Sequence, residues 1–242
     1  MRHCIFSDVH ANLEALEAFL AAAAKDSPDR YVFLVDVVGY GADPRACIAA
    51  VRKLGPEVLI AGNHEWGVIG LLDMGYFNEY AAAAIEWTRP LLDGEDTRYL
   101  ETFVLSREDG ACTFVHGSLE QPLRFRYVLD ADDAGRSMRL ARTPLIFVGH
   151  SHAAGVYYSG GGGAAKAAGM KARIEEGRAY LVNAGSVGQP RDGDQRLSYA
   201  IYDDGKRALE IKRADYDIAS ARKKILKAGL PEWLGSRLAE GR

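Results

Sequence analysis

The sequence predicts an α/β fold, and three observations indicate it. Near the N-terminus, short apolar runs alternate with helix-like segments in the β-α-β-α-β order of a parallel sheet with right-handed crossovers. The second half contains strand-like runs connected by turns, which is typical of antiparallel pairing. Between these halves, helical patterns replace the strand-like runs. No linker divides the chain, so we expect residues 1–242 to form a single domain.

The first strand and helix follow from the opening residues. The run His3–Phe6 is short and apolar, as in a buried strand. Asn12 is a favourable N-cap residue, and the segment Leu13–Lys25, rich in Ala, Leu and Glu, predicts the first helix. Tyr31–Val35 is rich in β-branched and aromatic residues and therefore predicts the second strand.

A second helix and a third strand complete this unit. We expect Asp43 as the N-cap and Pro44 as the first helical residue. The helix is predicted to end at Leu54, because Gly55 favours the left-handed conformation that stops a helix. Val58–Ile60 is the third short strand.

Residues 66–105 are predicted to form a small helical cap outside the sheet. The segment contains two or three helical patterns, which Pro90 and the Asp93-Gly94 pair interrupt.

The second half is predicted to contain five further strands, at Ala111–Val115, Leu145–Val148, Ala179–Val182, Ser198–Tyr202 and Ala208–Lys212. The run Gly160–Gly163 is expected to be a flexible loop tip or a local insertion. The tail Asp217–Arg242 is predicted to be helical, with a break at Gly229–Pro231.

Composition is that of an ordinary globular protein, with 48% hydrophobic and 26% charged residues. The net charge of −3 gives no basic surplus, so a nucleic-acid partner is not indicated. The three cysteines lie in apolar runs without metal-type spacing, and we expect them to be buried thiols in a reducing compartment. With neither a signal peptide nor a membrane-length apolar run, the protein is expected in the cytoplasm. The oligomeric state stays open.

The histidines share one position in the pattern. The chain has six, and His3 alone lies inside a predicted strand. The other five, together with two aspartates and an asparagine, come at or just after the C-terminal end of an apolar run: Asp8, His10, Asp36, Asn63, His64, His116, His150 and His152. In open α/β sheets, sites form beyond these strand ends, so we expect these side chains to converge.

Such a cluster predicts a metal centre. Imidazole and carboxylate together suit borderline divalent ions, namely Mn, Fe, Co, Ni and Zn. Seven or eight ligands are too many for one catalytic ion, but two ions sharing a carboxylate account for the number, as in hydrolases that act by in-line displacement. Taken singly, each of these residues is ordinary: a loop-facing histidine, a helix cap or a turn residue.

Five sequence blocks resemble the calcineurin-like metallophosphoesterase superfamily: "SDVHAN" (7–12), "VDVVGYG" (35–41), "GNHE" (62–65), "VHGS" (115–118) and "GHSH" (149–152). They occur in the superfamily's order, D-x-H, G-D, G-N-H-D/E, H and G-H-x-H. The stretches "NAGSVGQPRDGD" (183–194) and "AGLPEWL" (228–234) further resemble a branch of small bacterial and archaeal phosphodiesterase-like members. The resemblance implies a four-layer α/β/β/α sandwich of two mixed sheets flanked by helices.

The resemblance also implies a role for each residue. One ion would be held by Asp8, His10 and His152, and the other by Asn63, His116 and His150. Asp36 would bridge them, with a bridging hydroxide that attacks phosphorus. His64 would be the catalytic residue that assists the leaving group, on the same turn as Asn63 and Glu65. Glu65, a carboxylate next to this histidine, would orient His64. Arg191 is our own candidate for gripping the phosphate, because a guanidinium matches phosphate geometry, and the alternative is a solvated loop charge.

Two positions depart from the superfamily pattern. Val35 stands where the superfamily usually has a glycine before the bridging aspartate. Gly39-Tyr40-Gly41 replaces the Asp-Arg-Gly of protein Ser/Thr phosphatases, which argues against a phosphoprotein substrate. We therefore expect a small phosphoester as the substrate, either a monoester or a diester.

The sequence does not support a serine hydrolase or a nucleotide-binding module. "GHSHA" (149–153) lacks the last glycine of a serine-hydrolase elbow, and the glycine run precedes no phosphate-binding lysine helix. A catalytically weak scaffold of the same fold that binds partner proteins, and a phosphoprotein phosphatase, are the remaining alternatives.

Overall fold

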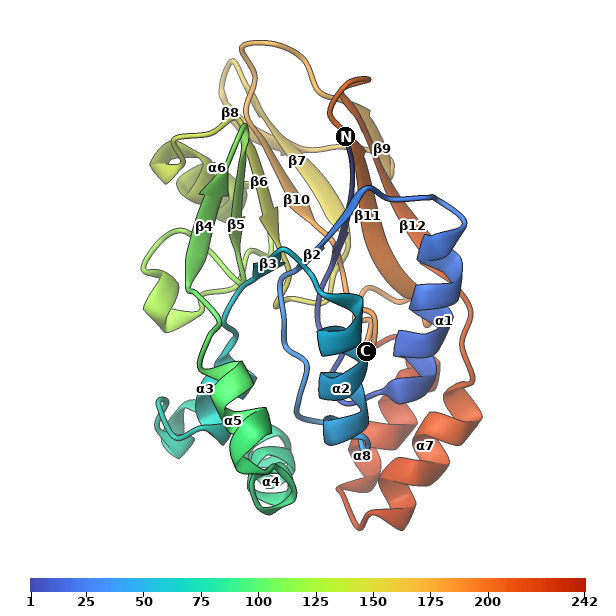
Figure 1. Ribbon diagram of the computed structural model, residues 1–242. Helices are drawn as coiled ribbons and strands as arrows, with labels where there is room; N and C mark the ends of the chain where they lie inside the picture. Colours follow the sequence, from blue (N-terminus) through green and yellow to red (C-terminus); the bar gives the residue numbers. More distant parts are fainter.

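Two mixed sheets of six strands each form the centre of the molecule (Figure 1), in a computed structural model that describes residues 1–242. Sheet A consists, from edge to edge, of β3 (Val58–Leu59), β2 (Arg30–Phe33), β1 (Arg2–Phe6), β11 (Leu197–Asp203), β12 (Ala208–Ala214) and β9 (Lys171–Arg173). Sheet B consists of β4 (Ser106–Asp109), β5 (Cys112–Val115), β6 (Leu145–Val148), β10 (Tyr180–Asn183), β7 (Gly155–Gly160) and β8 (Gly163–Lys166).

Helices cover the outer faces of both sheets. The helix α1 (Leu13–Ala24) packs on β11 and β12 of sheet A, and α6 (Ala131–Leu140) packs on β7, β8 and β10 of sheet B. The helix α2 (Pro44–Leu54) packs beside α1. The predicted sandwich of two mixed sheets flanked by helices is therefore confirmed. None of the helices has the length and apolar character needed to span a membrane.

The main core contains 42 buried side chains, and it extends from the space between the sheets to the contact of sheet A with α1 and α2, since Phe19 and Ile48 belong to it. In sheet A, the rings of Phe6 and Phe33 stack with centroids 4.4 Å apart. In sheet B, Phe114 and Phe147 stack at 5.6 Å, and Phe147 reaches across to Tyr202 of sheet A at 6.1 Å. Burying each large apolar side chain contributes roughly 1.5–3 kcal/mol, so this layer is the main source of stability.

The parallel pairs determine where the loops meet. In sheet A, β1 pairs in parallel with β2, and β2 with β3. In sheet B, β6 pairs in parallel with β5 and with β10. The C-terminal ends of neighbouring strands consequently lie at one edge of each sheet, which for sheet A is the lower end in Figure 1.

Helical segments fill the predicted cap. They are the last part of α3 (Asn63–Val68), the 3₁₀ turn Met74–Tyr76, α4 (Glu79–Thr88), the 3₁₀ turn Arg89–Leu91 and α5 (Gly94–Leu100). Pro90 lies in the second 3₁₀ turn, and Asp93 caps α5 through a capping box.

The C-terminal tail is helical, as predicted. It forms α7 (Ile218–Lys227), α8 (Glu232–Ser236) and a 3₁₀ turn, Arg237–Glu240. Gly229, between α7 and α8, has a positive φ of 73°.

The glycine run is the tip of the β7–β8 hairpin, in which Gly160 pairs with Gly163, so a loop tip is what the structure shows there. Other expectations need correction. The second strand ends at Phe33. Asp43 precedes α2 but makes no capping hydrogen bond, because its carboxylate accepts from Lys224 Nζ at 2.7 Å. The sequence reasoning did not predict β4, β7, β8, β9 and α6.

Asn12 links the first helix to the other half of the chain. Its Oδ1 accepts from Ala15 N at 3.1 Å as the cap of α1, and its Nδ2 donates to the Gly188 carbonyl at 2.8 Å. We expect Asn12→Ala to lower the free energy of unfolding by roughly 2–4 kcal/mol, since it removes a cap and leaves a buried carbonyl without a donor. Urea denaturation measures the loss.

Asn78 offers a matched control. It caps α4 through Ala81 N at 3.0 Å and is exposed. Asn78→Ala should cost only about 1 kcal/mol, the value of a cap alone. Equal losses for the two variants would contradict the linking role of Asn12.

Candidate metal centre

The structure brings the strand-end residues of both sheets into one buried cluster. Sheet A contributes the loops after β1, β2 and β3, and sheet B those after β5 and β6. None of the eight residues is more than 4% exposed: Asp8, His10, Asp36, Asn63, His64, His116, His150 and His152. Their roles as ligands or as catalyst stay predictions, whereas their convergence is an observation.

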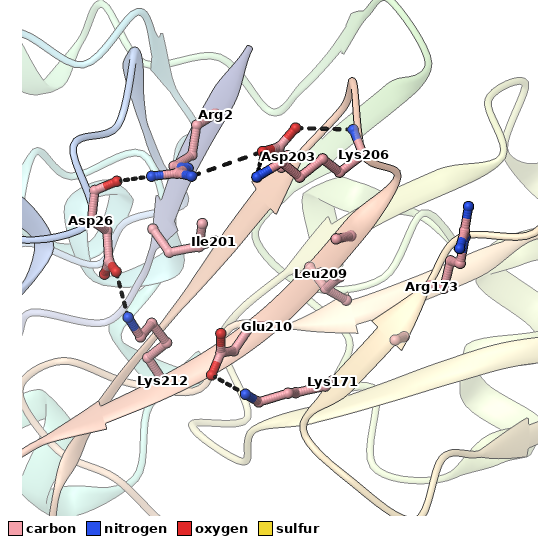
Figure 2. Close-up of a pocket in the computed structure, with 12 residues that line it drawn as sticks. Arg2, Asp26, Lys171, Arg173, Ile201, Asp203, Lys206, Leu209, Glu210 and Lys212 are labelled. Carbon is pink, nitrogen blue, oxygen red and sulfur yellow. Dashed lines mark hydrogen bonds and ion pairs between the residues drawn. The ribbon is translucent and has the colours of Figure 1, made fainter.

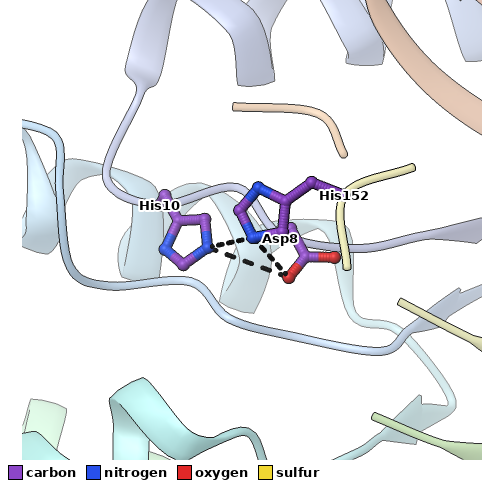
Figure 3. A group of neighbouring side chains, drawn as sticks. All are labelled: Asp8, His10 and His152. Carbon is purple, nitrogen blue, oxygen red and sulfur yellow. Dashed lines mark hydrogen bonds and ion pairs between the residues drawn. The ribbon is translucent and has the colours of Figure 1, made fainter. Parts of the chain in front are cut away.

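One half of the cluster consists of Asp8, His10 and His152 (Figure 3). The Nε2 atoms of the two histidines are 3.0 Å apart. Asp8 Oδ1 lies 3.3 Å from His152 Nε2 and 3.8 Å from His10 Nε2. The other carboxylate oxygen, Oδ2, accepts the His150 backbone N–H at 3.0 Å, which holds Oδ1 toward the imidazoles.

Asp36 belongs to both halves. Its Oδ2 lies 3.3 Å from His116 Nε2 and 3.8 Å from His10 Nε2. Together with His116 and His150 it forms a second group whose ligand atoms lie within 4.8 Å of one another. The Asp36 carboxylate therefore lies between the two groups of histidines.

Three of the rings are oriented in the same way, with Nδ1 donating to a backbone carbonyl: His10 to Val38 (2.9 Å), His116 to Leu34 (2.7 Å) and His152 to Gln189 (2.6 Å). A carbonyl oxygen only accepts, so Nδ1 carries the proton of the neutral ring. Each Nε2 then presents a lone pair to the cluster, which is the arrangement of a metal-ligating histidine.

The protein alone does not satisfy these atoms. Four buried atoms have no hydrogen-bond partner: Asp8 Oδ1, Asn63 Oδ1, His116 Nε2 and His150 Nε2. The lone pairs of His10 and His152 also face each other across 3.0 Å. Leaving such acceptors buried and unpaired costs free energy, and a cation removes that cost. An all-nitrogen and oxygen donor set without thiolate fits divalent transition ions.

Burial sets the charge state of the donors. It raises the pKa of Asp8 and of Asp36 to about 7. It lowers the pKa of His10, His150 and His152 well below the usual value for histidine. The imidazoles are therefore neutral at pH 7, as ligands must be, whereas the two carboxylates share protons until a cation displaces them.

Asn63, His64 and Glu65 form the first turn of α3, where a loop turn was expected. The His64 ring lies 4.7 Å from that of His10 and 4.5 Å from that of Tyr40, measured between centroids. Gly39 makes room for it, because a Cβ there would come within 2.1 Å of His64 Nδ1. That Nδ1 is buried and has no hydrogen-bond partner.

Glu65 has different contacts from those expected. Its Oε1 accepts the backbone N–H groups of Val37 at 2.7 Å and of Val38 at 3.2 Å. It makes no hydrogen bond with the His64 ring. Glu65 thus holds the loop that carries Asp36.

The backbone at Val35 explains why the superfamily has a glycine there. Its φ is 51°, in the left-handed region that glycine favours and that is costly for a β-branched residue. The Val35 side chain is fully buried in the main core, which offsets part of that cost.

Arg191 borders the cluster without a carboxylate partner. Its backbone N–H donates to the His152 carbonyl at 3.0 Å. Its guanidinium donates to Gln189 Oε1 from Nε at 3.2 Å and from Nη2 at 2.7 Å, and lies 5.3 Å from the centroid of the Tyr40 ring.

The sequence reasoning assigned no role to several residues that contact the cluster. The Tyr127 ring stacks on His150 with centroids 4.1 Å apart and planes 8° apart. Ser186 Oγ donates to the Asp8 carbonyl at 2.8 Å, and the Gln189 backbone carbonyl accepts a hydrogen bond from His152 Nδ1. Ser186 and Gln189 belong to the stretch 183–194, whose resemblance to superfamily members was a sequence signal for their place in the site. The sequence contains no comparable signal for Tyr127.

A cavity of about 440 Å³ lies elsewhere, on sheet A near the start of β1 (Figure 2). Its charged residues pair with one another: Lys171 Nζ lies 2.9 Å from Glu210 Oε1, and Lys206 Nζ 3.8 Å from Asp203 Oδ2. No cluster of potential metal ligands faces it.

The chain is similar to known proteins in sequence and in fold. The model of the calcineurin-like phosphoesterase superfamily domain matches residues 1–206. An uncharacterized protein of Methanocaldococcus jannaschii, MJ0912, is 39% identical over 244 residues, covering 98% of this chain and 97% of that protein. The crystal structure of a metallophosphoesterase from Sphaerobacter thermophilus is 39% identical, with a TM-score of 0.87 and full coverage of both chains. The hypothetical protein PH1004 of Pyrococcus horikoshii, at 20% identity, shares the fold with a TM-score of 0.81 over 100% of this chain and 98% of that one.

The buried carboxylates predict proton release when the metal-free protein takes up Mn²⁺. Because the pKa of Asp8 and of Asp36 is about 7, both are largely protonated at about pH 6 and must lose protons to bind a cation. At about pH 8.5 they are already ionised and release little. The apparent affinity for Mn²⁺ should therefore rise with pH to about 7 and then level off.

Calorimetric titrations in two buffers with different ionisation enthalpies measure the number of protons released at each pH. Release that stays constant from about pH 6 to about pH 8.5 would contradict the raised pKa values.

Proposed function

The chain belongs to the calcineurin-like phosphoesterase superfamily, which implies metal-dependent hydrolysis of phosphoesters, and we propose that it acts on a small phosphoester with two divalent ions. The observation that carries this proposal is the position of the Asp36 carboxylate between two groups of histidine nitrogens. One carboxylate shared by two ligand groups is the arrangement of a two-metal hydrolase.

We assign to each ion the candidate ligands of one half of the cluster. Asp8, His10 and His152 would hold one ion, and Asn63, His116 and His150 the other, with Asp36 shared. Mn, Fe, Zn, Ni and Co all suit these donors. When bound, such ions polarise phosphoryl oxygens and lower the pKa of water.

His64 is the candidate to help the leaving oxygen. Its ring shares the buried site with His10 and Asp36, and its backbone N–H donates to Asp36 Oδ1 at 3.1 Å. Nδ1 forms no hydrogen bond within the protein, so the ring is not committed to a structural partner. Burial, and then the charge of Arg191, lower the pKa of His64 well below its usual value, so the ring is neutral until it takes up a proton. In the imidazolium form the ring would give that proton to a departing alkoxide and return to the neutral form, which is general acid catalysis.

Tyr40 supports a small substrate over a phosphoprotein. It stands where the phosphoprotein phosphatases carry an arginine, and its ring packs against both His10 and His64. The phosphate-binding cation must then come from another element, and Arg191 is adjacent to the Tyr40 ring. The presence of every expected ligand also supports an enzyme over a binding scaffold.

Metal analysis tests the dinuclear site. After reconstitution and desalting, the wild-type protein should hold about two equivalents of Mn²⁺ or Zn²⁺ and hydrolyse p-nitrophenyl phosphoesters. Asp36→Asn should weaken both ions, because the shared carboxylate becomes a neutral amide. Asn63→Ala should weaken only one.

Elemental analysis and circular dichroism on each sample separate metal loss from unfolding. A plateau at one equivalent in a folded wild-type protein would falsify the two-ion proposal.

A leaving-group series tests His64. His64→Ala should retain both metals but lose up to ~10²–10⁴-fold in kcat on esters with a basic alkoxide leaving group, which needs a proton. Esters of nitrophenol should lose much less, since their anion departs unprotonated. The measurement is kcat for both proteins across esters of graded leaving-group pKa.

Loss of an ion in His64→Ala would make His64 a ligand. An equal loss across the series with metals retained would assign it to positioning.

A further inference from the structure

The loop between β6 and β7 supplies two of the candidate ligands and crosses the end of a third strand. Its residues 149–154 follow β6 and precede β7, and β10 lies between those two strands in sheet B (Figure 1). Asn183 is the last residue of β10 and pairs with Val148 of β6 on one side and with Gly155 of β7 on the other. The loop therefore passes over the position of Asn183.

The backbone of this loop has an unfavourable conformation at both ligands. His150 has a φ of 65° and His152 a φ of 56°, which is the left-handed region that costs free energy for a residue with a Cβ. Such a conformation persists only where the surrounding structure holds it. The contacts of the loop therefore determine whether the two imidazoles stay in place.

The side chain of Asn183 contacts the loop at two points. It is 1% exposed, and its Nδ2 donates to the Gly149 carbonyl at 3.0 Å and to Ser151 Oγ at 2.8 Å. Its Oδ1 accepts from Gly185 N at 2.9 Å, which determines the direction in which the amide points. Each of the two loop residues that accept from Nδ2 comes directly before one of the histidine ligands.

A second buried side chain of the same segment contacts only one half of the cluster. Ser186 Oγ donates to the Asp8 carbonyl at 2.8 Å and accepts from Gln189 N at 2.8 Å. The Gln189 carbonyl in turn accepts from His152 Nδ1 at 2.6 Å. Asp8 and His152 belong to the same half, whereas Asn183 contacts the loop that serves both halves.

We propose that Asn183 is a positioning residue for both ions, because it holds the loop so that His150 and His152 each face a different half of the cluster. An amide suits this task, since it donates and accepts at once and adds no charge beside the ligands. Removing a residue that orients metal ligands typically lowers metal affinity about 10–100-fold. The inference rests on the proposed function, since it concerns the two ions that this function requires.

The experiment measures the two Mn²⁺ affinities of the metal-free full-length protein by calorimetry. Asn183→Leu keeps the approximate size of the side chain but removes its donors and its acceptor, and we expect it to weaken both ions about 10–100-fold. Ser151→Ala removes one of the two acceptors of Nδ2 and should weaken both ions by a smaller factor. Ser186→Ala should weaken only one ion, the one in the half that contains Asp8.

Tyr199→Phe is the matched control for lost stability. Tyr199 is 2% exposed in β11, outside the cluster, and its hydroxyl donates to Asp26 Oδ2 at 2.9 Å. Losing a hydrogen bond to a charged group destabilises the fold, and thermal unfolding of each metal-free variant measures that loss. Tyr199→Phe should unfold at a lower temperature than the wild type and keep both Mn²⁺ affinities.

Wild-type affinity for both ions in Asn183→Leu would overturn the positioning role. If that variant does not fold, Ser151→Ala decides in its place, and unchanged affinities there would overturn the role. A fall in Mn²⁺ affinity in Tyr199→Phe as large as in the folded Asn183 variant would also overturn it, because lost stability would then explain both.

Failure of the proposed function gives a different result. A folded wild-type protein that takes up a single Mn²⁺ ion would refute the two-ion function. The positioning role of Asn183 would still stand if Asn183→Leu weakened that one ion and Tyr199→Phe did not.

Discussion

The carboxylate of Asp36 is the group on which the rest of the site depends. Oδ1 accepts the His64 backbone N–H at 3.1 Å, and Oδ2 faces the Nε2 atoms of His116 and His10 at 3.3 and 3.8 Å. Glu65 holds the following residues by their backbone N–H groups. The loop after β2 is therefore fixed from both sides, so that one carboxylate reaches the histidines of both sheets.

A site of this kind is costly for the protein that carries it. Buried acceptors without partners, two carboxylates with raised pKa and a β-branched residue in the left-handed region each disfavour folding. The 42-residue main core offsets these costs. The ligand atoms can stay unsatisfied because the backbone carbonyls of Leu34, Val38 and Gln189 orient the rings from behind.

The side chains that surround the cluster lie outside the main core. The ring of Tyr127 covers His150, and the Tyr40 ring separates His10 and His64 from the tail. The Arg191 guanidinium, which forms no salt bridge, lies 5.3 Å from the centroid of the Tyr40 ring.

The sequence by itself determined the order of the first five elements, the helical cap, the helical tail and the cluster of strand-end residues. These follow from local chemistry: Asn12 caps α1, Gly55 ends α2, and polar residues after parallel strands meet at one edge. Only the tertiary structure decided the sheet to which each strand belongs, the partner of Glu65 and the positions of Tyr40 and Tyr127. The edge strand β4 reads Ser-Arg-Glu-Asp, and β8 is partly exposed, so neither shows an apolar pattern. Their pairing, like the approach of the C-terminal tail to the site, depends on contacts between distant residues, and local sequence patterns do not encode such contacts.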